Sequence, residues 1–120
     1  MATPPPVGPY TPLVRAGGWL VASGQIGQVD GKLVNGGIVA ELRQAIANLQ
    51  AVLEAEGASL ADVVKTTVYL RHLGADYDAM NEAYVECFGD HRPARSAVGV
   101  AELPLGALVE VEAWARHAPG

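Results

Sequence analysis

The sequence is poor in cysteine, in aromatic residues and in positive charge. It has one cysteine, Cys87, and aromatic side chains make up 6% of its 120 residues. A lone cysteine forms no internal disulfide, so a cysteine-rich zinc or disulfide fold is excluded and a reducing, cytoplasmic compartment is expected. Eight Lys and Arg stand against thirteen Asp and Glu, giving a formal net charge of −5. Because nucleic-acid binding needs a basic face, we expect no nucleic-acid partner.

Long hydrophobic runs and targeting signals are also missing. No apolar run approaches the roughly 18 residues of a membrane span, so we expect no membrane partner. The first ten residues, MATPPPVGPY, lack the basic and apolar regions of a signal peptide. The sequence contains neither GxxxxGK[ST], GxGxxG nor HExxH, and no paired Cys/His spacing. It therefore predicts neither a nucleotide site nor a metal site.

Half of the residues are hydrophobic, enough to build the core of one domain over residues 1–120. Prolines concentrate near the start, so residues 1–9 are expected to form an extended arm. After a first helix over 38–56, a second helix is expected to be capped by Asp76 or Asp78 and to end at Gly89. The remaining patterns predict a β-hairpin over 13–23, a short strand at 32–34, and strands at 63–70, 94–100 and 107–114.

This order of elements predicts an α+β fold, a mixed sheet with two helices on one face. In the last strand Val109, Val111 and Ala113 alternate with Leu108, Glu110, Glu112 and Trp114, so both faces carry large apolar groups. Two helices cover only one face of such a sheet. We therefore expect a homo-oligomer.

Arg95 is the first residue whose setting suggests ligand binding. On the strand after Pro93, Arg95 shares its face with the small residues Ala97 and Gly99. An arginine with small neighbours stands over open space, and its planar guanidinium suits a carboxylate. The alternative is a structural arginine, either paired with an internal glutamate or lying along an edge.

Glu110 and Glu112 lie two apart in an apolar strand and point the same way. Two like charges on a half-buried face are unfavourable unless a cation, water or a ligand uses them. Either glutamate could be a structural partner of Arg95, or a general base that holds a water. Tyr10 is read either as a packed aromatic or as a lid, and Asn81 as a residue that faces water.

Seven short motifs, in this order, resemble the RidA/YjgF family of reactive enamine/imine deaminases. The resemblance runs from about Gly8 to Ala115, and its motifs are Gly8-Pro9-Tyr10, Ser23-Gly24-Gln25-Ile26, Asp62 to Leu70, Asn81-Glu82-Ala83-Tyr84, Pro93-Ala94-Arg95-Ser96, Leu103-Pro104 and Val109 to Ala113.

The resemblance implies a chorismate-mutase-like fold that forms a homotrimer with ligand clefts between subunits. It implies hydrolysis of 2-imino acids, such as 2-iminobutanoate and 2-iminopropanoate, to 2-oxo acids and ammonia without a cofactor. Arg95 would bind the substrate carboxylate and Glu110 would position the attacking water. The other cleft-lining positions would be Tyr10, Ser23, Asn81 and Ala97, the last standing where many members have Cys.

Two alternatives remain at this stage. The first is a non-enzymatic trimeric binding module, whose cleft holds a small carboxylate or a 2-oxo acid without turnover. The second is a related enamine or aminoacrylate substrate, because a fold does not fix a substrate.

Overall fold

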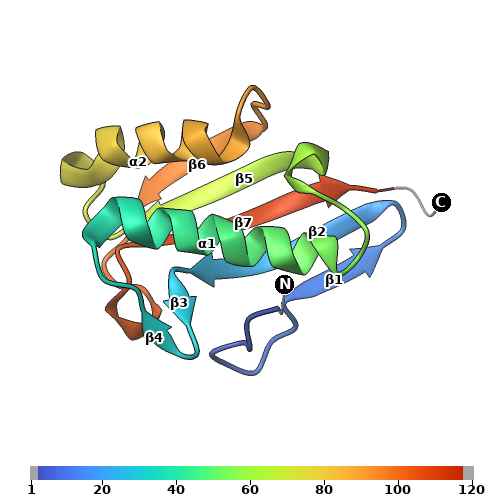
Figure 1. Ribbon diagram of the computed structural model, residues 1–120, viewed down its shortest axis with the longest axis horizontal. Helices are drawn as coiled ribbons and strands as arrows, with labels where there is room; N and C mark the ends of the chain where they lie inside the picture. Colours follow the sequence, from blue (N-terminus) through green and yellow to red (C-terminus); the bar gives the residue numbers. More distant parts are fainter. Residues whose placement is uncertain (1–2, 118–120) are drawn as a thin grey trace.

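The computed structural model describes residues 3–117 and is built on one mixed sheet (Figure 1). Its strand order is β1-β2-β7-β5-β6, with β5 and β6 parallel and the other neighbours antiparallel. Both helices lie across the same face of this sheet, which confirms the predicted α+β fold. The strands are β1 (Leu13–Ala16), β2 (Trp19–Ile26), β5 (Val63–Leu70), β6 (Ala94–Gly99) and β7 (Val109–Arg116), and the helices are α1 (Gly37–Glu54) and α2 (Leu73–Phe88).

The predicted apolar stripe of α1 forms the centre of the core. Leu42, Ile46, Leu49 and Leu53 are buried, as their spacing of three and four residues requires. The helix ends at Glu54, two residues before the predicted end. Gly57 follows with a φ of +79°, a conformation that glycine adopts without strain, and the chain turns there towards β5.

Three residues, Gly27, Asn48 and Glu41, hold α1 close to the ends of the strands. Gly27 packs against the helix backbone, since a Cβ at position 27 would lie 2.5 Å from the carbonyl oxygen of Glu41. Asn48 is buried, and its Nδ2 donates to the carbonyl oxygens of Ile26 and Gln28 at 3.0 Å each. The Glu41 carboxylate also accepts from the backbone N–H of Leu108. The helix thus satisfies backbone groups where the strands end.

The predicted start of α2 is wrong. The helix begins at Leu73, with His72 at the N-cap and no side-chain cap, so Asp76 lies inside the first turn and Asp78 further along the helix. Apolar contact replaces the cap, because Leu73 packs on the core directly after β5 ends. Gly89 ends the helix with a φ of +63°, as predicted.

Several strand ends also differ from the prediction. β2 continues past Ser23 to Ile26, because a bulge between Ala22 and Gln25 lets the chain stay paired with β7. β7 starts at Val109 instead of Ala107 and continues to Arg116, which pairs with Trp19. The glycine-rich segment after β2 forms a small hairpin of β3 (Gln28–Val29) and β4 (Lys32–Leu33).

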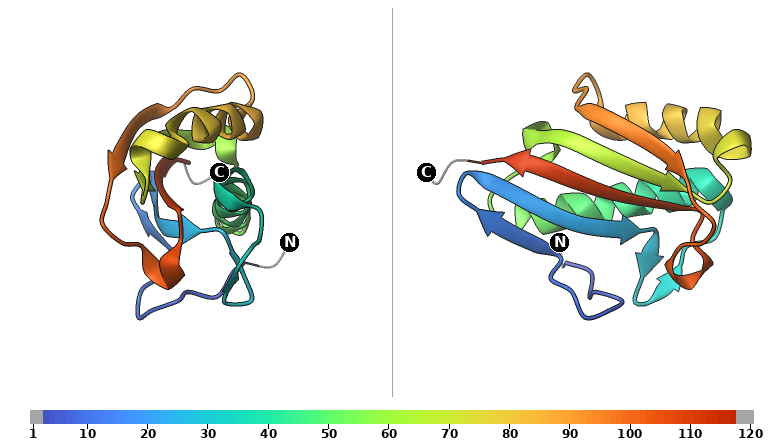
Figure 2. Two further views of the ribbon diagram at one scale, coloured as in Figure 1. Left: turned by 90° about the vertical axis from the view of Figure 1, so that its left-hand side faces the viewer. Right: turned by 180° about the vertical axis from the view of Figure 1, so that it is seen from behind.

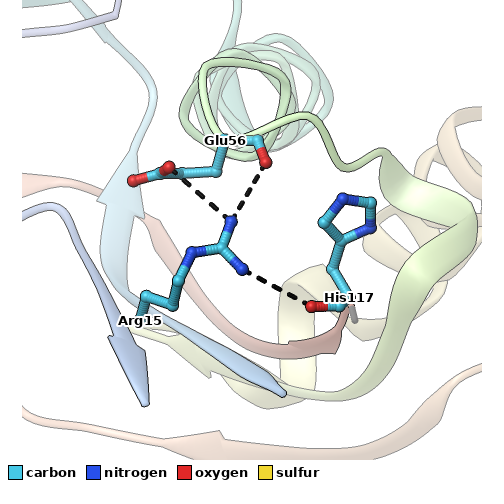
Figure 3. Close-up of polar contacts among 3 residues, drawn as sticks. All are labelled: Arg15, Glu56 and His117. Atoms are coloured by element: carbon cyan, nitrogen blue, oxygen red, sulfur yellow. Dashed lines mark hydrogen bonds and ion pairs between the residues drawn. The ribbon is translucent and has the colours of Figure 1, made fainter. Parts of the chain in front are cut away.

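Arg15 ties the edge strand β1 to the layer of helices (Figure 3). One guanidinium nitrogen, Nη2, donates to the carbonyl oxygen of Glu56 at 3.2 Å and lies 3.7 Å from its carboxylate, and Nη1 donates to the carbonyl oxygen of His117. These contacts join β1 to the segment that follows α1 and to the residue that follows β7. This arginine is structural.

The second face of the sheet carries no helix (Figure 2, right). Trp114 is 47% exposed there, and its neighbours across the strands are Val21 and Val14, the latter 51% exposed. Val98 on β6 adds a further exposed apolar side chain. The predicted alternation along β7 is observed, with Val109, Val111 and Ala113 buried under the helices. No helix within residues 3–117 is long and apolar enough to cross a membrane.

Candidate functional site

Arg95 lies on the helix-covered face of β6, at the edge of the sheet. Its neighbour across the parallel pair is Thr66, whose hydroxyl is buried and hydrogen-bonded to the Tyr84 hydroxyl of α2. Because Arg95 and Thr66 share a face, the arginine side chain extends towards α2. Alternation along β6 places Ala97 beside it on the same face, as predicted.

Aromatic and sulfur groups of α2 surround the Arg95 guanidinium. Its Cζ lies 4.9 Å from the ring centre of Tyr84 and 5.8 Å from that of Tyr77. Nη2 is 3.4 Å from the Tyr77 hydroxyl, and Nη1 is 3.7 Å from the sulfur of Met80. Cation–π contacts of this kind hold a guanidinium in place without neutralising its charge.

No carboxylate in residues 3–117 lies within ion-pair distance of Arg95. The alternative of a structural pair with an internal glutamate is therefore wrong. The strand pairing explains why Arg95 has no glutamate partner, because the side chains of Glu110 and Glu112 leave β7 on the face opposite to Arg95. The charge of Arg95 is available to an anionic ligand.

Two cavities meet at Arg95. The larger, of about 470 Å³, is lined by Leu73, Gly74, Tyr77, Asp78, Arg95 and Ala97. The smaller, of about 260 Å³, is lined by Asn81, Tyr84, Val85, Arg92, Pro93 and Arg95. In the smaller cavity the Asn81 Oδ1 atom is buried and lacks a hydrogen-bond partner among the described residues. The small side chain of Ala97 leaves space beside the guanidinium.

Glu110 lies on the open face of β7, in a separate cavity of about 220 Å³ lined by Val7, Tyr10, Ser23, Gly24, Pro104 and Glu110. Its carboxylate lies against the Gly24 backbone, since a Cβ at position 24 would be 2.6 Å from the Glu110 Cδ. Burial raises the pKa of the Glu110 carboxyl, and the charge of nearby Glu112 raises it further. A carboxylate with this environment is a better proton acceptor than an exposed one.

Two more of the predicted residues, Tyr10 and Ser23, lie at the Glu110 cavity. The Tyr10 hydroxyl accepts from the backbone N–H of Val7, and the Tyr10 N–H donates to the Gly8 carbonyl, so the ring is held but 40% exposed. The Ser23 hydroxyl donates to the Thr11 carbonyl at 2.6 Å. The hydroxyl of Ser23 thus anchors the arm across the bulge of β2.

The predicted residues therefore fall into two groups within one chain. Arg95, Ala97 and Asn81 lie on the helix side, whereas Glu110, Tyr10 and Ser23 lie on the open side. From the strand pairing, Arg95 and Glu110 are two strands and three residues apart, about 10 Å in each direction, and on opposite faces. A small substrate cannot touch both residues of the same chain.

Comparison with known proteins identifies the family of this chain. The family model described as Endoribonuclease L-PSP matches residues 1–117. A 2-iminobutanoate/2-iminopropanoate deaminase from Dermatophagoides farinae is 45% identical over 111 residues, covering 91% of this chain and 86% of that protein. The chain belongs to the RidA/YjgF family.

Other RidA relatives cover the chain just as fully. A RutC family protein from Pyrococcus horikoshii is 47% identical over 115 residues, covering 93% of this chain and 90% of that protein. The crystal structure of RidA from an Antarctic Psychrobacter superimposes with a TM-score of 0.90 at 39% identity, covering 95% of this chain and 93% of that one. The resemblance drawn from the seven motifs is confirmed.

Sequence reasoning assigned no site role to Tyr77 and Gly24, which line the cavities at Arg95 and Glu110, or to Tyr69, which stands opposite Glu110 in this RidA fold. Tyr77 is 39% exposed and contacts Arg95. Gly24 was read only as part of a motif, and Tyr69 only as part of a strand. The bulge at Gly24 and the cross-strand position of Tyr69 depend on the pairing of β2 and β5 with β7, which local sequence patterns do not specify.

Proposed function

We propose that this protein hydrolyses 2-imino acids, including 2-iminobutanoate and 2-iminopropanoate, to 2-oxo acids and ammonia. The single observation that carries the proposal is the Arg95 guanidinium, which faces open cavities and has no carboxylate partner in the described chain. The proposal is also supported by relatives, because several proteins that are 39–45% identical to this chain are named 2-iminobutanoate/2-iminopropanoate deaminase. We infer a reducing, cytoplasmic setting, in keeping with the single free cysteine.

In the proposed mechanism Arg95 and Glu110 have separate tasks. Arg95 forms paired hydrogen bonds with the substrate carboxylate and thereby fixes the orientation of the C=N group. Glu110 holds a water molecule and accepts its proton as the water oxygen bonds to the imine carbon. The imine nitrogen takes up a proton to give the carbinolamine. Glu110 then returns its proton to the amino group, the hydroxyl loses its proton to water as the C=O bond forms, and the C–N bond breaks to release ammonia and the 2-oxo acid. Tyr10, Ser23, Asn81 and Ala97 are proposed to line the cleft around the substrate.

We propose a homotrimer in which Arg95 of one subunit meets Glu110 of its neighbour. The separation of the two residues within one chain supports this arrangement, because chemistry that uses both needs two copies. The exposed apolar side chains of the open face, Val14, Val98 and Trp114, supply a surface for association. No metal or organic cofactor takes part in the proposed reaction.

RNA cleavage is not the function that we propose, although the matching family model carries an endoribonuclease name. The net charge is −5, and the cavity that holds Glu110 has no cationic lining residue. Binding of a phosphate backbone depends on such cations. An RNA substrate therefore has less support here than a small carboxylate.

The experiment is a substrate-panel assay with 2-imino acids made in situ by an amino-acid oxidase and trapped with semicarbazide. The protein is expected to speed formation of the 2-oxo acid, and Arg95→Ala to lower kcat/KM by about a hundredfold or more because the orienting clamp is lost. Arg43→Ala is the matched control, since Arg43 pairs with Glu86 on the surface of the helices and its loss should leave the rate unchanged.

Absence of acceleration with every imine, or an unchanged rate in Arg95→Ala, would contradict the proposal. Binding of a 2-oxo acid that saturates and needs Arg95, but occurs without turnover, would instead establish the carboxylate-binding module. Calorimetry with 2-oxobutanoate separates these outcomes.

A further inference from the structure

Glu110 has two polar neighbours on the open face that the proposed reaction does not use. Glu112 follows two residues later on the same face of β7, about 7 Å along the strand. Tyr69 of β5 stands directly opposite Glu110 in the antiparallel pair, and Thr67 stands opposite Glu112. The Tyr69 hydroxyl reaches diagonally across and donates its hydrogen bond to Glu112, not to the nearer pairing partner Glu110.

Because the Tyr69 hydroxyl donates to Glu112, it does not donate a hydrogen bond to the Glu110 carboxylate. Within residues 3–117 no protein hydrogen bond to the Glu110 carboxylate is recorded, so its lone pairs remain for water. Tyr69 stays a donor at neutral pH, because the hydrogen bond to Glu112 raises the pKa of the Tyr69 hydroxyl to about 12, with smaller contributions from burial and from the two carboxylate charges. A hydroxyl donated to Glu110 would instead weaken it as a proton acceptor.

Among residues 3–117 of the same chain, no positive charge lies against Glu110 to offset that of Glu112. The segment before β1 contributes Val7 and Tyr10 to the cavity, β2 contributes Ser23 and Gly24, and the loop before β7 contributes Pro104. Tyr69 faces Glu110 from β5.

The cations of neighbouring segments are engaged elsewhere. Lys65 donates to the Ser96 hydroxyl at 2.7 Å, and Arg71 donates to the Gly106 carbonyl at 3.2 Å. Among the described residues, Glu112 is thus the charged side chain that acts on Glu110, and its charge adds to the effect of burial on the Glu110 carboxyl.

We infer that Tyr69 and Glu112 are a pair of positioning residues, in which the hydroxyl holds the Glu112 carboxylate in place and that charge makes Glu110 a stronger base for the attacking water. The inference rests on the proposed function, because it takes Glu110 as the group that accepts the proton of water. Neither Tyr69 nor Glu112 needs to touch the substrate. Their effect is carried by one hydrogen bond and one charge–charge interaction.

The test is the pH dependence of kcat/KM for the intact oligomer with 2-iminobutanoate. In Glu112→Gln, the acid limb is expected to move to lower pH by about half a pH unit or more, because a like charge near Glu110 is gone. The plateau is expected to fall about two- to threefold, because the weaker base accepts the proton less readily. The matched control is Glu54→Gln, an exposed carboxylate on the helix layer that accepts from Gln50 and should leave the profile unchanged.

A double variant isolates the role of Tyr69. Tyr69→Phe removes the hydrogen bond that holds the Glu112 carboxylate in place, so its acid limb should move in the same direction and no further than in Glu112→Gln. Adding Tyr69→Phe to Glu112→Gln should change nothing more, since the hydroxyl acts only through that carboxylate. A further shift in the double variant would show that Tyr69 acts on Glu110 directly and would overturn the pairing.

Direct titration of Glu110 keeps the inference testable even if a variant loses activity. Carbon-13 NMR of glutamate-labelled protein, with Glu110→Gln to assign the signal, should show the Glu110 carboxyl titrating at lower pH in Glu112→Gln than in the unmodified protein. An unchanged titration would overturn the inference while leaving the proposed deaminase intact. If the unmodified protein turns over no imine, the proposed function fails, and the NMR comparison still decides whether Glu112 acts on Glu110.

Discussion

At the scale of single residues, the position of the Glu110 carboxylate depends on Gly24 having no side chain. Gly24 lies in the bulge of β2, and its missing side chain is the space that the end of Glu110 occupies. The contacting atoms belong to the flexible end of the glutamate, so a methyl group at position 24 would displace that end and leave the backbone in place. The bulge therefore sets where a water held by Glu110 would stand.

Gly24→Ala should consequently lower activity far more than stability. On the proposed mechanism we expect kcat/KM for imine hydrolysis to fall about ten- to a hundredfold, because a displacement of the order of 1 Å disturbs the attacking water. Binding of 2-oxobutanoate through Arg95 and the thermal midpoint should change little. Gly18→Ala is the matched control, since a Cβ at that position has nothing within 4 Å. Equal losses of activity in both variants would show that the bulge has no special role.

At the same scale, alternation along a strand was enough to pair Arg95 with Ala97 and Glu110 with Glu112. It was not enough to say which face each pair would occupy. That depends on the register of β5 with both β6 and β7, where Thr66 is the neighbour of Arg95 and Tyr69 the neighbour of Glu110. A shift by one residue would exchange the two faces, which is why a pairing of Arg95 with either glutamate could be imagined from the sequence but does not occur.

At the scale of elements, α1 is joined to the sheet by polar groups as well as by its apolar stripe. Asn48 carries two hydrogen bonds to backbone carbonyls at the junction of β2 and β3, deep under the helix. Its amide replaces the water that these carbonyls would otherwise bind. The junction lies directly after the bulge that faces Glu110, so the helix helps to hold that bend.

Asn48→Ala is expected to destabilise the fold by about 2 kcal/mol, because two buried carbonyl groups lose their donor. Urea unfolding followed by circular dichroism measures the change. Gln50→Ala, on the same helix but with a half-buried side chain hydrogen-bonded to Glu54, should change the free energy of unfolding by less than about 0.5 kcal/mol. If Asn48→Ala lowered the free energy of unfolding no more than this control, water would be satisfying the carbonyl groups of Ile26 and Gln28.

The elements themselves were predictable because their patterns are local. The β-branched run at β5 was placed without error, and the stripe of α1 was correct to within two residues. The ends that failed depend on contacts from distant parts of the chain. Leu73 starts α2 by packing on the core without a capping side chain, and Arg116 extends β7 because Trp19 of β2 lies opposite.

At the scale of the whole molecule, the two halves of the candidate site face away from each other. Mixing two inactive variants tests the proposed trimer directly. Arg95→Ala and Glu110→Gln subunits, refolded together in equal amounts, should regain about a quarter of the unmodified rate, since a quarter of randomly formed clefts contain both intact residues.

Arg95→Ala mixed with the Arg95→Ala/Glu110→Gln double variant is the control and should stay inactive. If mixed oligomers form, as mass spectrometry can verify, and the first mixture also stays inactive, the site is not shared between subunits.

The placement of Arg95 and Glu110 on opposite faces has a consequence for the life of the protein in a cell. On the proposed function, a newly made chain carries both reactive groups and yet is inert, because neither group can serve the other within the same polypeptide. Activity would then rise with the supply of chains more steeply than in direct proportion, until the concentration at which trimers dominate is passed. On this proposal, the amount of chain present would decide when hydrolysis of imines begins.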